Sequence, residues 1–326
     1  MIVTLTLNPS LDRTLEVDRL ERGAVLRAAS AHLDPGGKGV NVTRALLANG
    51  VDSRAVIPCG GAEGAQLVRL LAEESVHTVA VPIASRTRSN VTLVEANGAV
   101  TKVNEPGAPL TPAEFDAVAA AVLGCAGTAD WVVMCGSLPP DVPVDVYAGL
   151  TAQFAAAGIR VAVDTSGPAL LSAVAAGPDL VKPNREELAE AVGAPLPGLG
   201  DVVEAARSLR ALGAGRVLAS LGADGAVLVD DDGVRLAQGT AVEPRSTVGA
   251  GDALLAGFLA ASVRDQKPDE ALAEAVAWGA AAVSLPGSRM PGPDDIDPCR
   301  DGVRLLPASP DRLPAHRSAS AYINTL

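Results

Sequence analysis

WVVMCGSLPPDVPVDVYAGLTAQFAAAGIRVAVD, residues 131–164, contains the unit from which the fold of this chain can be predicted. Trp131–Cys135 is an uninterrupted apolar run of strand length, as is Val161–Asp164 up to its last residue. Val144–Ala157, which lies between them, has the length and apolar spacing of a helix. Strands without alternation are typical of a sheet buried on both faces, and a helical crossover joins parallel neighbours. The stretch therefore predicts a βαβ unit.

The same alternation of strand and helix extends to both sides of this unit. Further strands are expected at Ile2–Leu7, Ala55–Pro58, Thr78–Pro82, Leu180–Lys182, Arg216–Ser220, Ala226–Asp230, Val234–Leu236 and Gly302–Leu306. Further helices are expected at Asn41–Ala48, Gln66–Glu74, Arg185–Val192, Val202–Leu212, Ala253–Val263, Asp269–Leu285 and after Thr111, which begins a capping box with Glu114. This order predicts an α/β fold of three layers, with a mostly parallel sheet between helices.

Two other segments predict a smaller, antiparallel sheet outside the main body. Residues 14–20 and 24–33 alternate apolar and polar side chains, as half-exposed strands do. Residues 91–95 and 99–103 flank Asn97-Gly98, a strong two-residue hairpin signal.

Composition excludes several classes of function. The 326 residues carry a net charge of −12, which argues against nucleic-acid and membrane-surface partners. The longest apolar stretches, such as Ala275–Leu285, are about half a membrane span. The chain starts MIVTLTLNPS without a secretion signal, and its four cysteines form no CxxC pair. We therefore expect a cytoplasmic protein with reduced thiols and no structural zinc site.

The sharpest motif is Ser246-Thr247-Val248-Gly249-Ala250-Gly251-Asp252, directly before an apolar helix. Small residues at a helix N-terminus leave backbone N–H groups free to face an anion, and the helix dipole adds partial positive charge. Asp252 would repel a phosphate, but it would suit a general base that acts between a phosphate and a substrate hydroxyl. Taken alone, the motif is better explained by Asp252 as a helix N-cap.

Two further motifs admit a structural and a functional interpretation. Gly36-Gly37-Lys38-Gly39-Val40-Asn41 would let a ligand approach the backbone closely, or would simply turn a strand into a helix. In Lys182-Pro183-Asn184-Arg185-Glu186-Glu187, the oxygens of Asn184 and Glu187 lie on one face of a helical turn. They would suit a hydrated Mg²⁺, or they would cap the helix.

Taken together and in this order, from Ile2 to about Pro293, these segments resemble the ribokinase/PfkB family of ATP-dependent sugar kinases. The resemblance rests on Gly36–Asn41, on Val248–Asp252 and on KPNREEL between them. It implies a ribokinase-like kinase domain over residues 1–307, with a β-sheet lid from about 11–33 and 86–104. Residues 308–326 would form a mobile C-terminal tail.

The resemblance also implies a role for each motif residue. Asp252 would deprotonate the acceptor hydroxyl, and the amides of Gly249, Ala250 and Gly251 would stabilise the charge on the transferred phosphoryl group. ATP and Mg²⁺ would be the cofactors. The nucleotide side would comprise Lys182, Asn184, Ser220, Gly222 and Gly225, with Asn184 and Glu187 holding the metal through water. The sugar side would comprise Asp12, Gly36, Gly37, Asn41 and Ser137.

Basic residues narrow the expected substrate. Arg88, Arg27 and Lys38 would bind a phosphate already present on the sugar, for which the arginine fork is well suited. With NPSLD, TRSN, KVNEPG, GSLPP and VDTSG, they look most like the bacterial 1-phosphofructokinase and tagatose-6-phosphate kinase subgroup. The expected acceptor is fructose 1-phosphate, with tagatose 6-phosphate and fructose 6-phosphate as alternatives.

The resemblance also predicts a homodimer, and two other functions are alternatives to it. Lids of this kind often pair across a dimer in the family, so the lid is where we expect a second copy to bind in a homodimer. A sugar-phosphate sensor without catalysis is the alternative from another class, and the intact Asp252 with its preceding glycines argues against it. A nucleoside kinase would leave Arg27 and Arg88 without a partner.

Overall fold

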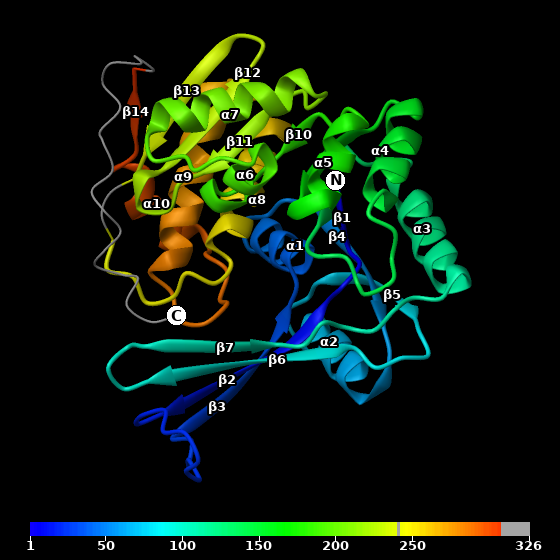
Figure 1. Ribbon diagram of the computed structural model, residues 1–326, viewed down its shortest axis with the longest axis vertical. Helices are drawn as coiled ribbons and strands as arrows, with labels where there is room; N and C mark the ends of the chain where they lie inside the picture. The colour runs from blue at the N-terminus through cyan, green and yellow to red at the C-terminus, as the bar shows by residue number, and fades with distance from the viewer. Residues whose placement is uncertain (240–241, 308–326) are drawn as a thin grey trace.

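The computed structural model describes residues 1–239 and 242–307, and a ten-stranded sheet forms its centre (Figure 1). The strand order is β14-β13-β12-β11-β10-β9-β8-β1-β4-β5. The strands are β1 (Ile2–Thr6), β4 (Ser53–Cys59), β5 (His77–Pro82), β8 (Trp131–Cys135), β9 (Arg160–Asp164), β10 (Leu180–Val181), β11 (Val217–Ser220), β12 (Ala226–Asp230), β13 (Gly233–Gln238) and β14 (Arg304–Leu306). From β5 to β11 each neighbour is parallel, and β12, β13 and β14 pair antiparallel.

The βαβ unit predicted from residues 131–164 is confirmed. β8 and β9 pair parallel, with Cys135 opposite Asp164, and α4 (Val146–Ala156) joins them. Every residue of β8 is buried, as its uninterrupted apolar run predicts, and β1 is buried throughout as well, including the polar Thr4 and Thr6.

Helices cover both faces of the sheet, so the three-layer prediction is also confirmed. Ile2 packs among the helices of one face, and Val3 packs among those of the other face. One face carries α1 (Lys38–Ala48), α2 (Gly61–Glu73), α8 (Ala250–Val263), α9 (Pro268–Val283) and α10 (Pro293–Arg300). The other carries α3 (Pro112–Ala126), α4, α5 (Gly167–Ala175), α6 (Arg185–Val192) and α7 (Leu199–Ala211).

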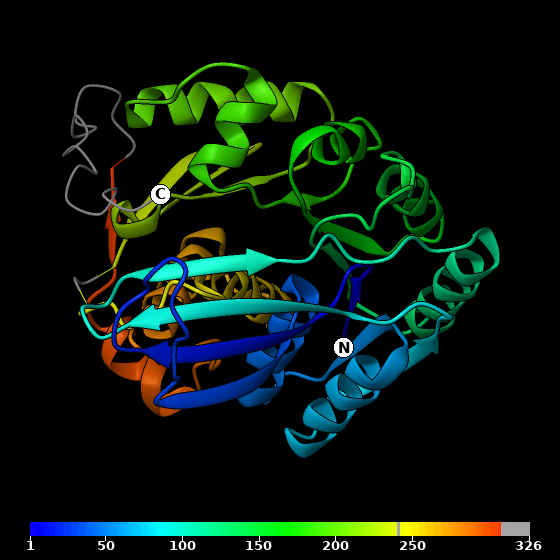
Figure 2. The same cartoon turned by 60° about the horizontal axis from the view of Figure 1, so that its bottom comes forward.

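A second sheet of four strands projects from one end of this body (Figures 1 and 2). Its order is β3-β2-β6-β7, with β2 (Ser10–Val17), β3 (Ser30–Gly36), β6 (Arg88–Glu95) and β7 (Val100–Asn104). The Asn97-Gly98 hairpin is confirmed by the antiparallel pairing of β6 with β7. The prediction of a wholly antiparallel sheet is wrong, because β2 and β6 pair in parallel. They continue from β1 and β5, which run in the same direction within the parallel core sheet.

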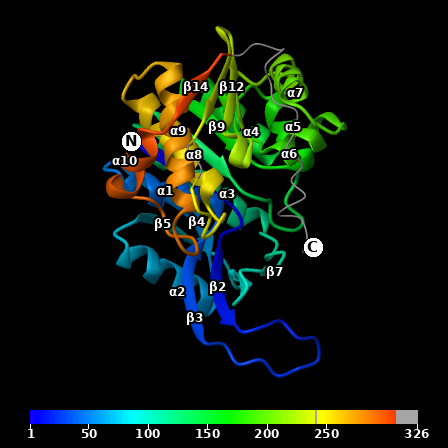
Figure 3. The same cartoon turned by 90° about the vertical axis from the view of Figure 1, so that its left-hand side faces the viewer.

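Other differences have local causes. The two strands predicted at 14–20 and 24–33 are observed at Ser10–Val17 and Ser30–Gly36, so they are separated by more residues than predicted. Residues 18–29 join them and extend away from the body (Figure 3). The sequence does not predict α5, because the helix begins with Gly-Pro, a pair typical of a turn. It does not predict α10 either, because this polar helix buries only Ile296 and Cys299, too few residues to produce a periodic pattern. No helix in residues 1–239 or 242–307 is long and apolar enough to cross a bilayer. The tail predicted for 308–326 lies outside the described residues.

Candidate active site

The N-terminus of α8 forms the centre of the candidate site. Gly249 occupies its N-cap with φ of 77°, a left-handed conformation that favours glycine. The first bond into the helix goes from the N–H of Ala253 to the carbonyl of Gly249, at 2.8 Å. The N–H groups of residues 250–252 precede it, in the positions where helices bind anions. Asp252, in the first turn, is only 7% exposed.

A cluster of charges brings together residues that are far apart in the sequence. The Nζ atom of Lys38, on α1, lies 2.7 Å from Oδ1 of Asp164 and 3.1 Å from Oε1 of Glu187. The Nζ atom of Lys182 lies 3.1 Å from the other oxygen of Asp164. A side chain at Gly251 would begin 3.4 Å from that same Nζ atom. Lys182 therefore connects Asp164 to the first turn of α8.

Asp252 receives a hydrogen bond from the other glycine-rich motif. Nδ2 of Asn41 donates to its Oδ2 at 2.8 Å. Burial and then the Asp164 carboxylate raise the pKa of Asp252 to about 6, against the opposing effects of Lys38, Asn41 and Lys182. Desolvation disfavours the ionised carboxylate, so Asp252 takes up a proton more readily than a surface aspartate. This is the property expected of a general base that works near neutral pH.

The charges around Asp252 are held in fixed states. Burial alone would raise the pKa of Asp164, but Lys182 and Lys38 together hold it below the usual value. Burial opposes the charge of Lys38, but Asp164, Glu187 and Asp252 together raise its pKa above the usual value. Asp164 therefore stays ionised and Lys38 stays protonated at neutral pH. Two ammonium groups and several carboxylates surround the helix N-terminus.

Asn184 and Glu187 form the capping box that their spacing allows. Oδ1 of Asn184 accepts from the N–H of Glu187 at 2.7 Å, and Oε2 of Glu187 accepts from the N–H of Asn184 at 2.9 Å. Across the described ranges, no three His, Cys, Asp or Glu side chains gather as direct metal ligands. Carboxylate oxygens that already accept one bond still have lone pairs for metal-bound water, and Mg²⁺ keeps several of its waters. The residues therefore fit a metal held through water, and they do not fit a direct protein cage.

The predicted nucleotide-side residues lie next to this box. Ser220 ends β11 and forms an isolated parallel bridge with Asn184. Gly222 and Gly225 belong to a tight turn that leads into β12, where the N–H of Leu221 donates to the carbonyl of Gly225 at 2.8 Å. The structure thus places Ser220 and Asn184 side by side at the carboxyl ends of β11 and β10, where α/β sheets bind ligands.

Of the predicted sugar-side residues, the second sheet contributes Asp12 and Gly36, whereas Gly37 and Asn41 belong to the start of α1 and Ser137 follows β8. In β2, Oδ1 of Asp12 accepts from Oγ of Ser10 at 2.7 Å and from Nδ2 of Asn90, in β6, at 2.9 Å. A side chain at Gly36 would begin 2.4 Å from Oδ2 of Asp12. Glycine is therefore required there, because any Cβ atom would collide with the Asp12 carboxylate.

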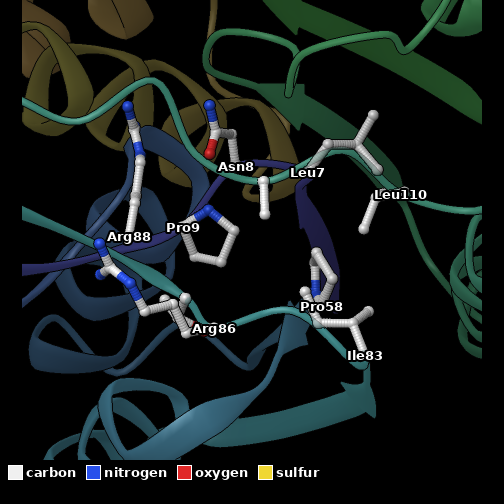
Figure 4. Close-up of a pocket in the computed structure, with 10 residues that line it drawn as sticks. Leu7, Asn8, Pro9, Pro58, Ile83, Arg86, Arg88 and Leu110 are labelled. Atoms are coloured by element: carbon white, nitrogen blue, oxygen red, sulfur yellow. The ribbon is translucent and has the colours of Figure 1, made fainter.

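Arg88 begins β6, and Nη1 of its guanidinium donates to the carbonyl of Glu105 at 3.1 Å. Its Nε atom is buried and has no partner in the described parts of the chain. A small hollow lies beside it, with Arg86 and Arg88 on one side and apolar Pro58, Ile83 and Leu110 on the other (Figure 4). Arg88 thus retains an N–H group available to an anion. Ser137 is exposed, and its Oγ lies 3.4 Å from Nδ2 of Asn8.

The three residues predicted to bind the sugar phosphate lie on separate elements: Arg88 begins β6, Lys38 begins α1, and Arg27 lies between β2 and β3. The placement of Arg27 on a lid strand is wrong, because the residue lies exposed in the connector between β2 and β3. The connector carries too few core-facing side chains to continue the sheet. Lys38 pairs with Asp164 and Glu187, so its role at a sugar phosphate stays a prediction.

Two residues of the site were not predicted. Asp164 ends β9 and is fully buried between the two lysines, and Asn90 binds Asp12 across the second sheet. Both stand in short segments with a turn-like composition, VDTSG and TRSN. The signal that could have revealed Asp164 is a carboxylate at the end of a wholly apolar strand, because that end faces the ligand edge of the sheet.

A buried carboxylate of raised pKa in the first turn of a helix, hydrogen-bonded by Asn41 and near two lysines, is an arrangement expected of an enzyme that transfers a phosphoryl group to a hydroxyl. The model of the pfkB family of carbohydrate kinases matches residues 5–295, and the chain belongs to this family. It is therefore an ATP-dependent sugar kinase, as the motifs predict.

Named relatives cover nearly all of the chain. A 1-phosphofructokinase from Rhodobacter capsulatus is 42% identical over 298 residues, which are 90% of this chain and 94% of the relative. The ATP-dependent 6-phosphofructokinase isozyme 2 of Escherichia coli is 38% identical over 90% of this chain and 96% of its own. The crystal structure of Escherichia coli phosphofructokinase-2 with substrates and products has a TM-score of 0.87 and 37% identity, covering 92% of this chain and 98% of its own.

Proposed function

We propose that this kinase transfers the γ-phosphoryl group of ATP to the 6-hydroxyl of fructose 1-phosphate, giving fructose 1,6-bisphosphate and ADP. The observation that carries the proposal is the buried Asp252 carboxylate, bound by Asn41 at 2.8 Å in the first turn of α8. Relatives named 1-phosphofructokinase, at 42% and 40% identity, support the choice of acceptor.

In the proposed reaction, Asp252 takes the proton of the 6-hydroxyl as that oxygen attacks the γ-phosphorus. The bond from the γ-phosphorus to the bridging oxygen breaks, and ADP leaves with the electron pair. The amides of Gly249, Ala250 and Gly251 stabilise the charge on the transferred group. Lys182, which lies beside Gly251, adds positive charge on the same side. The ionised state of Asp252 is therefore the active one.

Nucleotide phosphates need a counter-charge that the side chains supply only in part. Mg²⁺ bound with ATP would neutralise the phosphate oxygens and orient them. Glu187 would hold its water shell, with Asn184 beside it, because the capping bonds leave the Glu187 carboxylate lone pairs for water. Lys38 keeps Glu187 oriented through the contact of 3.1 Å.

The second sheet would act as the lid and recognise the acceptor. Asp12 and Asn90 present oxygen and nitrogen atoms for sugar hydroxyls, and Arg88 presents its buried, unoccupied Nε for the phosphate that the sugar already carries. Arg27 would join them only when its connector moves or when it reaches a second copy. A cytoplasmic location for the enzyme also stays a prediction.

We also propose a homodimer formed through the lid. Val100 and Val103 on β7 are 47% and 59% exposed, and Val25 in the connector is 86% exposed. Exposed apolar side chains on the second sheet and on its connector favour a protein partner. A relative, phosphofructokinase-2 of Escherichia coli, has an inhibited form described as tetrameric. Sedimentation of the protein and of a Val103→Arg variant would decide: a wild-type monomer refutes the dimer.

The decisive experiment measures ADP release with Mg-ATP against fructose 1-phosphate, fructose 6-phosphate, tagatose 6-phosphate, fructose and ribose. A kcat/KM about 100-fold higher for fructose 1-phosphate, roughly 2.7 kcal/mol of discrimination, would support the proposal. Asp252→Asn serves as the inactive control. A preference for unphosphorylated sugars would refute the role of Arg88.

Fructose 6-phosphate is the second candidate acceptor. The 6-phosphofructokinase isozyme 2 of Escherichia coli, at 38% identity, is nearly as similar to this chain as the 1-phosphofructokinases. A preference for fructose 6-phosphate in the same assay would exchange the two candidates without changing the role of Asp252. If none of the five sugars is phosphorylated while the protein still binds ATP, the result would favour a sugar-phosphate sensor without catalysis.

A further inference from the structure

Arg44 is a buried charge at the centre of four segments, and no motif assigns it a role. Its side chain, in α1, is 5% exposed. Nε and Nη2 donate to the two carboxylate oxygens of Glu74, at the C-terminus of α2, at 2.6 and 2.8 Å. Nη1 lies 3.4 Å from the carbonyl of Pro35 and 3.0 Å from that of Ser288. One guanidinium therefore touches α1, α2, β3 and the segment after α9.

The same Nη1 atom lies 3.3 Å from Oδ1 of Asn41, one turn earlier in α1. Asn41 is the residue whose Nδ2 donates to Asp252 at 2.8 Å. A side-chain amide has an accepting end and a donating end, and nothing in its shape decides which way it points. A guanidinium only donates and a carboxylate only accepts. The amide of Asn41 is therefore compatible with its two neighbours in one orientation.

We propose that Arg44 is a positioning residue that fixes the orientation of the Asn41 amide and thereby holds the base, Asp252, in place. This inference rests on the proposed function, in which Asp252 is the base. Without Arg44 the oxygen of the Asn41 amide loses a donor, and the amide is free to rotate away from Asp252. The hydrogen bond from Nδ2 of Asn41 would then weaken, which would disfavour the ionised form of Asp252 and let its side chain move.

The charges near these groups are consistent with this role. Glu74 neutralises Arg44 from α2, and Asp34 of β3 also lies within its electrostatic reach. Asp252 itself is faced by Lys38, Lys182 and Asp164. Arginine suits the position because its planar fork binds Glu74 through two nitrogens while Nη1 still serves Asn41. A lysine has one ammonium group and cannot reproduce this arrangement.

A double-mutant cycle between Arg44 and Asn41 tests the proposal. Arg44→Met is expected to lower kcat by about 10- to 100-fold, the weight of a hydrogen bond to a charged group, with the KM for ATP unchanged. In an Asn41→Leu background the same substitution should change kcat by less than about twofold, because coupled residues are not additive. A full loss in that background would show that Arg44 does not act through Asn41.

A matched control separates positioning from packing. Glu74, the charged partner of Arg44, has a side chain that is 40% exposed. Glu74→Gln removes the charge of this partner and keeps Arg44 and its contact with Asn41. Its kcat should stay near that of the wild type. If Glu74→Gln loses as much activity as Arg44→Met, the guanidinium is only a structural tie between α1 and α2, and the proposal is wrong.

A readout without substrate keeps this test separate from the test of the acceptor. The Asp252 carboxyl carbon, labelled with carbon-13, reports its pKa by NMR in the free protein. The titration midpoint should rise in Arg44→Lys, which keeps the positive charge but loses the fork, and should stay unchanged in Glu74→Gln. An unchanged midpoint in Arg44→Lys would overturn the proposal. If the wild type phosphorylates no acceptor, the proposed function fails, and this measurement still decides on Arg44.

Discussion

The core sheet and the second sheet differ in burial, and the two halves of the site differ with them. Every residue of β1 and β8 is buried, whereas every residue of β6 is partly exposed and most of β7 is exposed. The core supplies Asp252, Asp164 and Lys182, each less than one-tenth exposed. Charges interact more strongly where water is excluded. Under the proposed function, the chemistry would belong to the buried half and the recognition of the acceptor to the open half.

The largest expected effect tests the buried half. Asp252→Asn should lower turnover by about 10²–10⁴-fold or more, the usual weight of a general base. ATP binding and fold should persist, because the amide has the same shape and its oxygen still accepts from Asn41. Stopped-flow and steady-state ADP release measure the turnover, and calorimetry measures ATP binding. Near-wild-type turnover would show that Asp252 is not the base. It would also contradict the assignment of the chemistry to the buried half.

The second effect concerns stability within the core. Asp164→Asn leaves the buried Lys182 without its carboxylate, which should lower the free energy of unfolding by about 3–5 kcal/mol at pH 7. The Asp164 pKa lies below its usual value, so its stabilisation is present above the unfolded pKa of about 4 and is lost as the pH falls through the folded pKa. Urea unfolding at pH 7 and at low pH should show the difference between the two proteins narrowing. Equal stability at pH 7 would contradict the ion pairs.

A substitution in the open half should act on binding. Arg88→Ala is expected to raise the KM for the sugar phosphate by about 10- to 100-fold, with a smaller change in kcat, because it removes a charge-assisted hydrogen bond. The KM for unphosphorylated fructose provides the control and should not move. A fall in kcat without a change in KM would mean that the second sheet participates in the chemistry.

The smallest effect is a shift along the pH axis. Asp252 acts as a base when ionised, so activity should increase as the pH rises through about 6 and then level off. A sugar phosphate ionises near the same pH, so the variant comparison decides the assignment. Lys38→Met should move this rise in activity to higher pH, because the Lys38 ammonium favours the ionised Asp252 carboxylate. Arg88→Ala should leave the pH of the rise unchanged. A shift in Arg88→Ala would show that the second sheet affects the ionisation of Asp252.

Much of the fold was predictable because its signals are local. Trp131–Cys135 is apolar throughout and forms the strand at the predicted residues, and the turn between β6 and β7 needs the φ of 87° at Gly98 that few residue types adopt. The parallel pairing of β2 with β6 was not predictable, because it depends on strands that lie 70 residues apart and on the direction of the core sheet. Local patterns do not specify such contacts.

The site was predictable where a motif is continuous and not where it is assembled in space. Asp252 and Asn41 stand in recognisable continuous motifs, each in the first turns of a helix, and the structure places them in contact. Asp164 was missed because its partners, Lys38 and Lys182, come from other elements. Arg27 was misplaced because the connector has the residue types of a strand without a sheet neighbour.

The register of β2 constrains how this enzyme can diverge. Asp12 lies opposite Asp34 on one side and Asn90 on the other. A strand register is discrete, and a shift by one residue turns every side chain to the opposite face. A deletion within β2 would therefore remove Asp12 from the site in one step, whereas the connector at 18–29 can change length without altering the pairing. Insertions and deletions accumulated by descendants of this gene should fall in the connector, while acceptor preference changes through substitutions at fixed positions.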